Sequence, residues 1–335
     1  MNVRNDREED RMTMTHSTTA ERPRLADLFS LSGATGPLIG LVLLCIFLSF
    51  ATDSFFTMRN LLNVLDQITV LGIMAVGMTL VILIGGIDLA VGSVLALAMM
   101  VMGYVANVAG FPLGLAIIVA LACAAASGAV SGLLITLFNV PAFISTLAMM
   151  SIARGLANMI TDGQQIVGFP AWFSMLAFIR HWGFLTTTVA VMLIVFALGW
   201  FFLRYTSAGR SLYAIGGNPE VARLAGINVS LMTVGVYVVS SLLAGLGGVV
   251  LAMRLDSVQP TAGFTYELDT IAAVVIGGTS LSGGQGGIVG TIIGVLIIGV
   301  LRNGLNLLGV SPFTQAVVIG VVIALAVAAE AFKKR

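Results

Sequence analysis

The sequence carries little charge. Charged residues make up 9% of its 335 residues, whereas hydrophobic residues make up 58%. A soluble domain carries about 25% charged residues. This composition excludes an ordinary soluble enzyme and indicates a polytopic helical membrane protein. The net charge of +1 also argues against nucleic acid as a partner, because binding it requires a basic surface.

Groups that serve catalysis and nucleotide binding are scarce too. The lysines are Lys333 and Lys334, at the C-terminal end, and the histidines are His16 and His181. Because the sequence has no G-x-x-x-x-G-K-[ST] motif, we expect no ATP binding through a P-loop. It also shows no metal-ligand pattern and no nucleophile beside a base. The sequence therefore predicts a protein that is not an enzyme and that uses no cofactor and no metal.

One motif has to be set aside. Residues 281–285 read Leu-Ser-Gly-Gly-Gln, which is the signature sequence of ABC-type ATPase subunits. That motif works beside the P-loop of a partner domain, within a soluble α/β fold. Here it stands between two apolar stretches, so we interpret the match as coincidence.

What the sequence has in abundance is long apolar stretches. A membrane-spanning helix needs about 20 such residues, and ten stretches approach that length. They cover residues 36–52, 68–86, 89–108, 112–138, 141–160, 184–203, 229–252, 267–280, 287–304 and 312–331. The sequence thus predicts an all-α polytopic membrane protein with about ten transmembrane helices. The amphipathic stretch Phe55–Gln67 is expected to form a helix that lies in the membrane interface.

The distribution of basic residues predicts an orientation. Lys and Arg gather on the cytoplasmic side of membrane proteins, and here they concentrate in the N-terminal tail, in residues 204–230 and at the C-terminus. Residues 1–33 lack the apolar core of a signal peptide, so we expect a cytoplasmic tail there. Residues 34–335 would form the transmembrane domain. An even number of spans leaves both termini in the cytoplasm.

Residues 204–230 form the one long internal stretch that is too polar to cross a membrane; we call it the polar segment. Within it, Asn218 and Pro219 are typical of a helix start, because Asn caps free N–H groups and Pro is tolerated at the first helical position. Glu220 suits the positive end of the helix dipole, and Gly226 fits the left-handed residue past a helix end. The pattern predicts a short, rigid cytoplasmic helix.

This helix, at residues 219–225, has two interpretations. It is either an ordinary capped loop between two spans or a lever that docks into a partner protein. A helix this short is not stable alone, so its caps and the flanking spans must hold it. Its exposed side chains would then be available to a partner, Glu220 and Arg223 first among them.

Glycine pairs mark candidate pathway or gating positions. Two similar breaks interrupt apolar stretches, one at Gly85 and Gly86 and the other at Gly277 and Gly278. Gly-interrupted segments in corresponding halves of a chain point to the transport site of repeat-built transporters. The similarity between the two breaks is short, so it does not by itself establish a repeat.

Two charged residues are further pathway or gating candidates. Asp88 lies between two apolar stretches and is either a functional group at membrane depth or a residue that caps the following helix. Arg154 lies in the middle of a predicted span, where it must face a cavity, an acid or free carbonyl groups. A structural role and a pathway role are both open for it. Glu267 and Asp269 are interpreted as acids in the first turn of a short span.

Four motifs together resemble a known family. They are GGIDLAVGS (85–93), NPEVARLAGINV (218–229), QPTAGFTYELDTIAAVVIGGTSLSGG (259–284) and NGLNLLGVS (303–311). From about residue 36 to residue 331 the chain resembles the monosaccharide permeases of ABC importers, with the ribose permeases as the nearest group. The N-terminal tail is longer and the loop 161–183 shorter than in a ribose permease, which leaves the sugar open.

The resemblance implies a type II ABC importer-like permease fold and a homodimer in the bacterial inner membrane. Two copies of an ABC ATPase subunit would sit on its cytoplasmic face, and a periplasmic sugar-binding protein would deliver ribose or a related monosaccharide. The residues that match the ATPase-coupling region of the family are Asn218, Pro219, Glu220, Arg223, Leu224 and Gly226. The chain itself would form the translocation pathway.

Two other classes of function are open. One is a secondary transporter of a small polar solute, driven by H⁺ or Na⁺ through Asp88 and Arg154. The other is a membrane-embedded enzyme, which the scarcity of catalytic groups disfavours. A capped docking helix favours the importer, because a self-sufficient transporter needs no lever.

Overall fold

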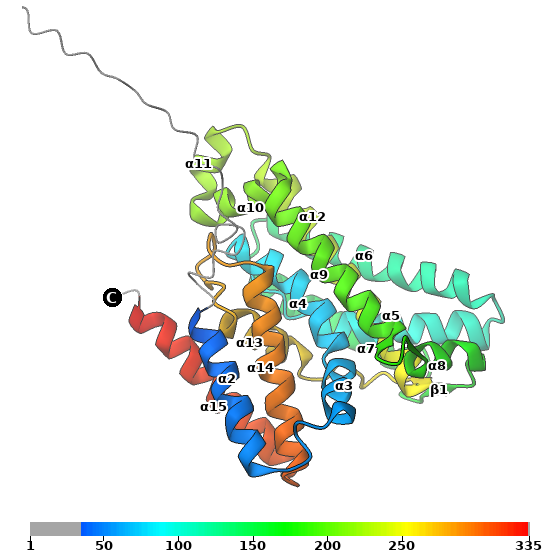
Figure 1. Ribbon diagram of the computed structural model, residues 1–335. Coiled ribbons are helices and arrows are strands. Elements are labelled where there is room, and N and C mark those ends of the chain that lie inside the picture. Colours follow the sequence, from blue (N-terminus) through cyan, green and yellow to red (C-terminus); the bar gives the residue numbers. More distant parts are fainter. Residues whose placement is uncertain (1–34, 334–335) are drawn as a thin grey trace, which may run out of the picture. The chain divides into compact units, whose positions relative to one another are not determined.

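The computed structural model describes residues 35–333 (Figure 1). The tail predicted for residues 1–33 lies outside the described residues. Every predicted apolar stretch forms a helix, so the all-α prediction is confirmed. These ten helices are α2 (Thr35–Ala51), α4 (Thr69–Leu83), α5 (Val91–Gly103), α6 (Leu113–Leu137), α7 (Ala142–Met159), α9 (Thr187–Tyr205), α12 (Val229–Leu255), α13 (Tyr266–Ile276), α14 (Ile288–Leu307) and α15 (Pro312–Lys333).

Shorter elements connect these helices. The helical ones are α3 (Met58–Gln67), the π-helical turn η2 (Tyr104–Val108), α8 (Ala171–Phe178), α10 (Ser207–Gly217) and α11 (Pro219–Leu224). Strand β1 (Ile166–Val167) pairs antiparallel with β4 (Ser257–Val258), and β2 (Arg180–His181) pairs antiparallel with β3 (Leu185–Thr186). The predicted amphipathic helix is present as α3, and its position in a membrane interface stays a prediction.

Helix length and composition do not confirm all ten predicted membrane crossings. Within residues 35–333, six helices are long and apolar enough to cross a membrane: α5 with η2, α6, α7, α9, α12 and α14. A seventh is added if α3 and α4, which meet at a bend of 44°, form one span. The clearest departure is α13, because its 11 residues reach only about 16 Å. The hydrocarbon core of a bilayer is about 30 Å thick.

Helix α12 is the centre of the bundle, where it packs against α4, α5 and α6. Small residues permit this close approach. A Cβ on Gly132 of α6 would lie 2.7 Å from Cα of Val234 in α12. Every residue of α4 except Leu71 is buried, which explains why this helix is apolar on all sides. By contrast α2 fully buries only Leu48. Leu41, Leu44 and Cys45 are partly buried against the core, and most of its other large apolar side chains are exposed.

Candidate functional site

The polar segment folds into the two short helices α10 and α11, which are joined at Asn218. The Asn218 side chain caps α11, because its Oδ1 accepts hydrogen bonds from the backbone N–H groups of Glu220 (3.0 Å) and Val221 (3.2 Å). Pro219 occupies the first helical position. An N–H at this position has no acceptor within the helix, so its absence in proline costs no hydrogen bond. The helix start predicted from the sequence is therefore confirmed.

Gly226 closes the other end of α11. It has a φ of +85°, which a residue with a side chain rarely adopts. Its N–H donates to the carbonyl of Arg223 at 3.0 Å, and the N–H of Ile227 donates to the carbonyl of Ala222 at 3.1 Å. The observed helix ends at Leu224, one residue before the predicted end.

The outward surface of α11 combines charge with apolar area. Glu220 and Arg223 form an ion pair of 2.8 Å whose side chains are largely exposed. Leu224 is 89% exposed and Val221 is 59% exposed, whereas Ala222 is 2% exposed and faces inward. The helix is thus held by one small buried residue and presents a charged pair beside two apolar side chains.

Helix α10 anchors α11 to the rest of the chain. Its Leu212 and Ile215 are buried, and the hydroxyl of Tyr213 donates to the carbonyl of Gly286 at 3.0 Å. Burial raises the pKa of Tyr213, which keeps its hydroxyl protonated as a donor. The polar segment is therefore a fixed structure rather than a free loop.

Each predicted glycine pair contains one exposed glycine that turns the chain and one buried glycine in close contact. Gly85 (φ +76°) follows α4, and Gly278 (φ +91°) follows α13. A Cβ on Gly86 would lie 2.5 Å from the hydroxyl oxygen of Tyr237, and one on Gly277 would overlap the backbone of α14. Turns and close packing account for these glycines, and a role in a pathway stays a prediction.

Asp88 is 1% exposed and both of its carboxylate oxygens accept hydrogen bonds. Oδ1 accepts from the N–H of Ala90 at 3.0 Å, and Oδ2 accepts from the hydroxyl of Ser240 at 2.8 Å. The preceding carbonyl, of Ile87, accepts from the hydroxyl of Thr146 at 3.2 Å. Asp88 thus fixes the turn that begins α5 and ties it to α12, which agrees with the interpretation of a helix-end residue.

Arg154 faces free carbonyl groups, one of the three partners that the sequence left open. Its Nη1 donates to the carbonyls of Pro260 (2.5 Å) and Ala262 (2.8 Å). The same stretch packs on the start of α5, since a Cβ on Gly263 would lie 2.7 Å from the carbonyl oxygen of Gly92. Arg154 therefore holds an irregular stretch of backbone in place between helices.

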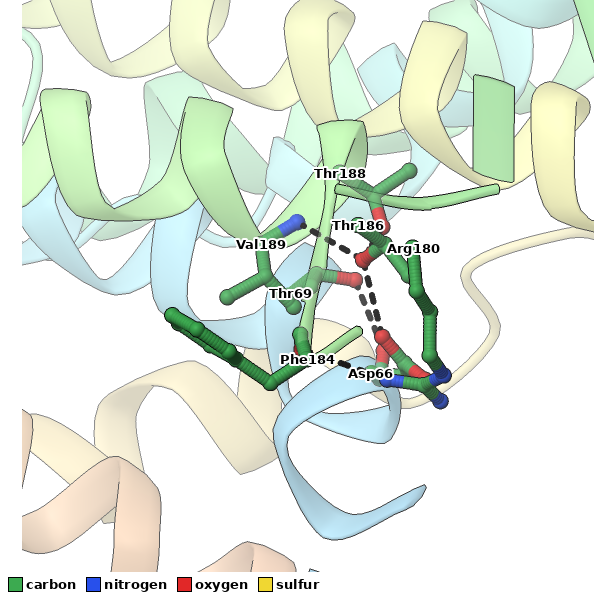
Figure 2. A network of polar contacts seen from close by, with 7 residues as sticks. All are labelled: Asp66, Thr69, Arg180, Phe184, Thr186, Thr188 and Val189. Atoms are coloured by element: carbon green, nitrogen blue, oxygen red, sulfur yellow. Dashed lines mark hydrogen bonds and ion pairs between the residues drawn. The ribbon is translucent and has the colours of Figure 1, made fainter. Parts of the chain in front are cut away.

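Two ion pairs join residues that are far apart in the sequence, so the spacing of neighbouring residues could not predict them. Asp269 lies in the first turn of α13, as expected, but its carboxylate pairs with Arg302 of α14 at 2.6 Å. Asp66, at the end of α3, pairs with Arg180 at 2.5 Å and accepts from the hydroxyl of Thr186 at 2.9 Å (Figure 2). These contacts fasten α13 to α14, and the β2–β3 hairpin to α3.

A small cavity with both polar and apolar lining residues lies beside the first of these ion pairs. Its volume is about 40 Å³, and its lining includes Gln67, Tyr266, Asp269 and Arg302. A space of this size admits a few water molecules. It is too small for a sugar, so this cavity is not a sugar-binding site.

Comparison with known proteins decides the class of this chain. Residues 60–327 match the family described as "Branched-chain amino acid transport system / permease component". The chain belongs to this permease family. Together with its spanning helices, the match establishes a multi-pass membrane protein of a transport family. No solved structure gives a significant match.

The relatives of this permease include several import permeases. It is 49% identical over 299 residues to the "Ribose import permease protein RbsC" of Escherichia coli (strain K12), covering 87% of this chain and 91% of that protein. It is 48% identical over 294 residues to the protein of the same name from Bacillus subtilis (strain 168), with the same two coverages. It is 37% identical over 306 residues to the "Fructose import permease protein FrcC" of Rhizobium meliloti, covering 89% and 85%.

Proposed function

We propose that this permease is the membrane subunit of an ATP-driven importer of a monosaccharide, ribose or a closely related sugar. The observation that carries the proposal is the 49% identity to a ribose import permease over 87% of the chain. Relatives named for fructose and for galactose are 37% identical. The family description names branched-chain amino acids, but the individual relatives cited here are named for sugars, and they define the substrate class that we propose.

The proposed topology has ten membrane segments, with both termini and the polar segment on the cytoplasmic side of the bacterial inner membrane. The difficulty is α13, which is too short to cross. We propose that α13 completes its crossing together with strand β4 and the irregular stretch 259–265 that precede it. Irregular backbone is tolerated at membrane depth only where its polar groups are satisfied inside the protein. The two bonds from Arg154 to Pro260 and Ala262 supply such partners.

Within the importer, α11 would dock into a separate ABC ATPase subunit. The residues that we assign to coupling are Asn218, Pro219, Glu220, Arg223, Leu224 and Gly226. Asn218, Pro219 and Gly226 shape the helix, and the exposed Glu220, Arg223 and Leu224 offer the contact. An apolar side chain beside a charged pair suits a protein partner better than water alone. The permease would act as a homodimer that receives sugar from a periplasmic binding protein.

In this proposal the residues predicted as pathway or gating candidates have structural roles. Gly85, Gly86, Gly277 and Gly278 would let the chain turn and pack where helices break. Asp88 would hold the turn before α5, and Arg154 would hold the stretch before α13. The ion-driven alternative has no observation in its favour, because both oxygens of Asp88 and the Nη1 of Arg154 are already engaged within the protein.

The test is reconstitution of the permease in lipid vesicles with its co-expressed ATPase subunit and binding protein. Pentoses, hexoses and leucine are screened for stimulation of ATP hydrolysis and for uptake. We expect ribose to give the strongest stimulation. Stimulation by leucine and by no sugar would overturn the proposed substrate class.

A further inference from the structure

Gly216, near the C-terminal end of α10, packs directly against the backbone of two other segments. A Cβ on Gly216, the second-last residue of α10, would overlap the carbonyl oxygen of Leu83 and the backbone nitrogen of Gly284. The N–H of Gly284 donates to that same Leu83 carbonyl at 2.9 Å. A Cβ on Gly283 would lie 2.9 Å from the nitrogen of Gly85 and 3.0 Å from Cα of Gly216. We call these five residues the glycine junction.

The junction joins three parts of the chain that are far apart in sequence. Leu83 is the last residue of α4, and Gly85 lies in the turn after it. Gly216 is the second-last residue of α10, and Gly283 and Gly284 belong to the loop that follows α13. A second contact lies one helical turn earlier, where the hydroxyl of Tyr213 donates to the carbonyl of Gly286 in that loop. Helix α10 is therefore attached to the loop at two points.

A contact made by backbone alone transmits displacement differently from a contact between side chains. Side chains can change rotamer and absorb a shift, whereas two packed backbones have no such freedom. Asn218 ends α10 and begins α11, so the two helices are joined without a flexible linker. Helix α10 therefore gives a movement of α11 a direct route to the glycine junction.

The loop after α13 also carries an unpaired group. The Oγ1 of Thr279 is buried and has no hydrogen-bond partner among the described residues. Buried hydroxyls in native proteins are nearly always paired. The loop after α13 therefore holds a buried hydroxyl that no described residue pairs with.

We propose that the glycine junction carries the movement of α10 and α11 to the end of α4 and to the loop after α13, and that Gly216 is the positioning residue that makes this contact possible. This inference rests on the proposed function, in which the ATPase docks on α11. From the junction the movement reaches both helix breaks, since α4 leads into the turn at Asp88 and the loop connects α13 with α14.

The chain provides a matched control in the next residue. Gly217 belongs to the same end of α10, and a Cβ there would meet nothing within 4 Å. Gly216→Ala and Gly217→Ala therefore change helix propensity alike and differ in whether the added methyl group collides with backbone. Tyr213→Phe offers a milder variant, because it removes the bond to Gly286 without adding volume.

The experiment measures radiolabelled ribose taken up per ATP hydrolysed in vesicles that hold the permease, its ATPase and its binding protein. A merely structural defect lowers uptake and hydrolysis in proportion and leaves this ratio unchanged. We expect Gly216→Ala to lower the ratio by about tenfold relative to Gly217→Ala. Tyr213→Phe should lower it by a smaller factor with normal membrane yield.

The outcomes separate this inference from the proposed function. If Gly216→Ala assembles and keeps the ratio of Gly217→Ala, the glycine junction transmits nothing and the inference fails. If Gly216→Ala cannot be recovered from membranes, Tyr213→Phe decides, and an unchanged ratio there overturns the inference. If the unmodified chain and Gly217→Ala neither retain the ATPase nor take up ribose, the proposed function is what fails.

Discussion

Arg154 shows how a single side chain can supply hydrogen bonds to backbone carbonyls that lie outside helices and sheets. One nitrogen of its guanidinium donates to two carbonyls, of Pro260 and Ala262. A buried carbonyl that loses its partner costs about 1–3 kcal/mol. The charge is thus tolerated inside a predicted span because the protein supplies it with acceptors.

Replacing Arg154 by leucine should therefore destabilise the permease. Both carbonyls lose their donor, and the expected loss is about 1–3 kcal/mol for each of them. The measurement is the melting temperature in detergent together with the yield from membranes. Arg154→Lys keeps a donor and the charge and should lose less. A leucine variant that melts at the wild-type temperature would show that the bonds to the loop are dispensable.

For single residues, the sequence predicts those roles that depend on neighbours a few positions away along the chain. The caps at Asn218 and Gly226 follow from spacing within a few residues, and they are observed as predicted. The partners of Arg154 are 106 and 108 residues away. No spacing rule identifies a partner at that distance, so the sequence could only name the kinds of group that would serve.

Among the elements, α11 exposes an ion pair of its own, between Glu220 and Arg223. Glu220→Arg combined with Arg223→Glu reverses both charges and keeps the possibility of a pair across one helical turn. An exposed pair is worth about 0.2–1 kcal/mol, so the fold should change little. We expect the ATPase subunit to be lost on purification and uptake of radiolabelled sugar to fall sharply.

The measurement is co-purification of the ATPase beside uptake in whole cells. Membrane yield of the permease serves as the control for insertion. Wild-type uptake together with wild-type co-purification would mean that α11 is only a capped loop, and the docking proposal would be wrong.

A second element-scale prediction concerns how α13 is fastened to α14. The side chain of Asp269 is 5% exposed and that of Arg302 is 37% exposed, so the pair is only partly screened by solvent. Removing one partner leaves a charge uncompensated. Asp269→Leu and Arg302→Met should each lower the melting temperature. The double variant should lose less than the sum of the two, with a coupling of about 0.5–3 kcal/mol. Strict additivity would show that the pair contributes nothing.

The ten helices were predictable because an apolar stretch is a local signal. The length of α13 was not, since the predicted span 267–280 is helical only to Ile276. The helix begins within one residue of the predicted start and ends at the glycine pair, where Gly278 turns the chain with a φ of +91°. The sequence marks this pair as a break, but the packing of Gly277 against the backbone of α14 depends on the tertiary fold.

At the scale of the whole molecule, the first prediction concerns whether the permease itself uses ATP. The lysines lie at the C-terminal end, so the purified permease alone should neither bind nor hydrolyse ATP. Gly283 and Gly284, the glycines of the ATPase-like signature, have φ values of +83° and +72° and are explained by the turn and the glycine junction. Equilibrium binding of labelled nucleotide to the isolated permease is the measurement. Saturable binding would overturn our interpretation of residues 281–285 as coincidence.

The central place of α12 has a consequence for how the protein is made. Helices α4, α5 and α6 all pack on α12, yet the ribosome delivers them first. Until residue 229 is synthesised, the growing chain has no partner for the faces that α12 will cover. Their apolar character lets lipid or the insertion machinery shelter them in the meantime. A translation product that stops before α12 would keep an unfilled centre, and cellular proteolysis is its expected fate.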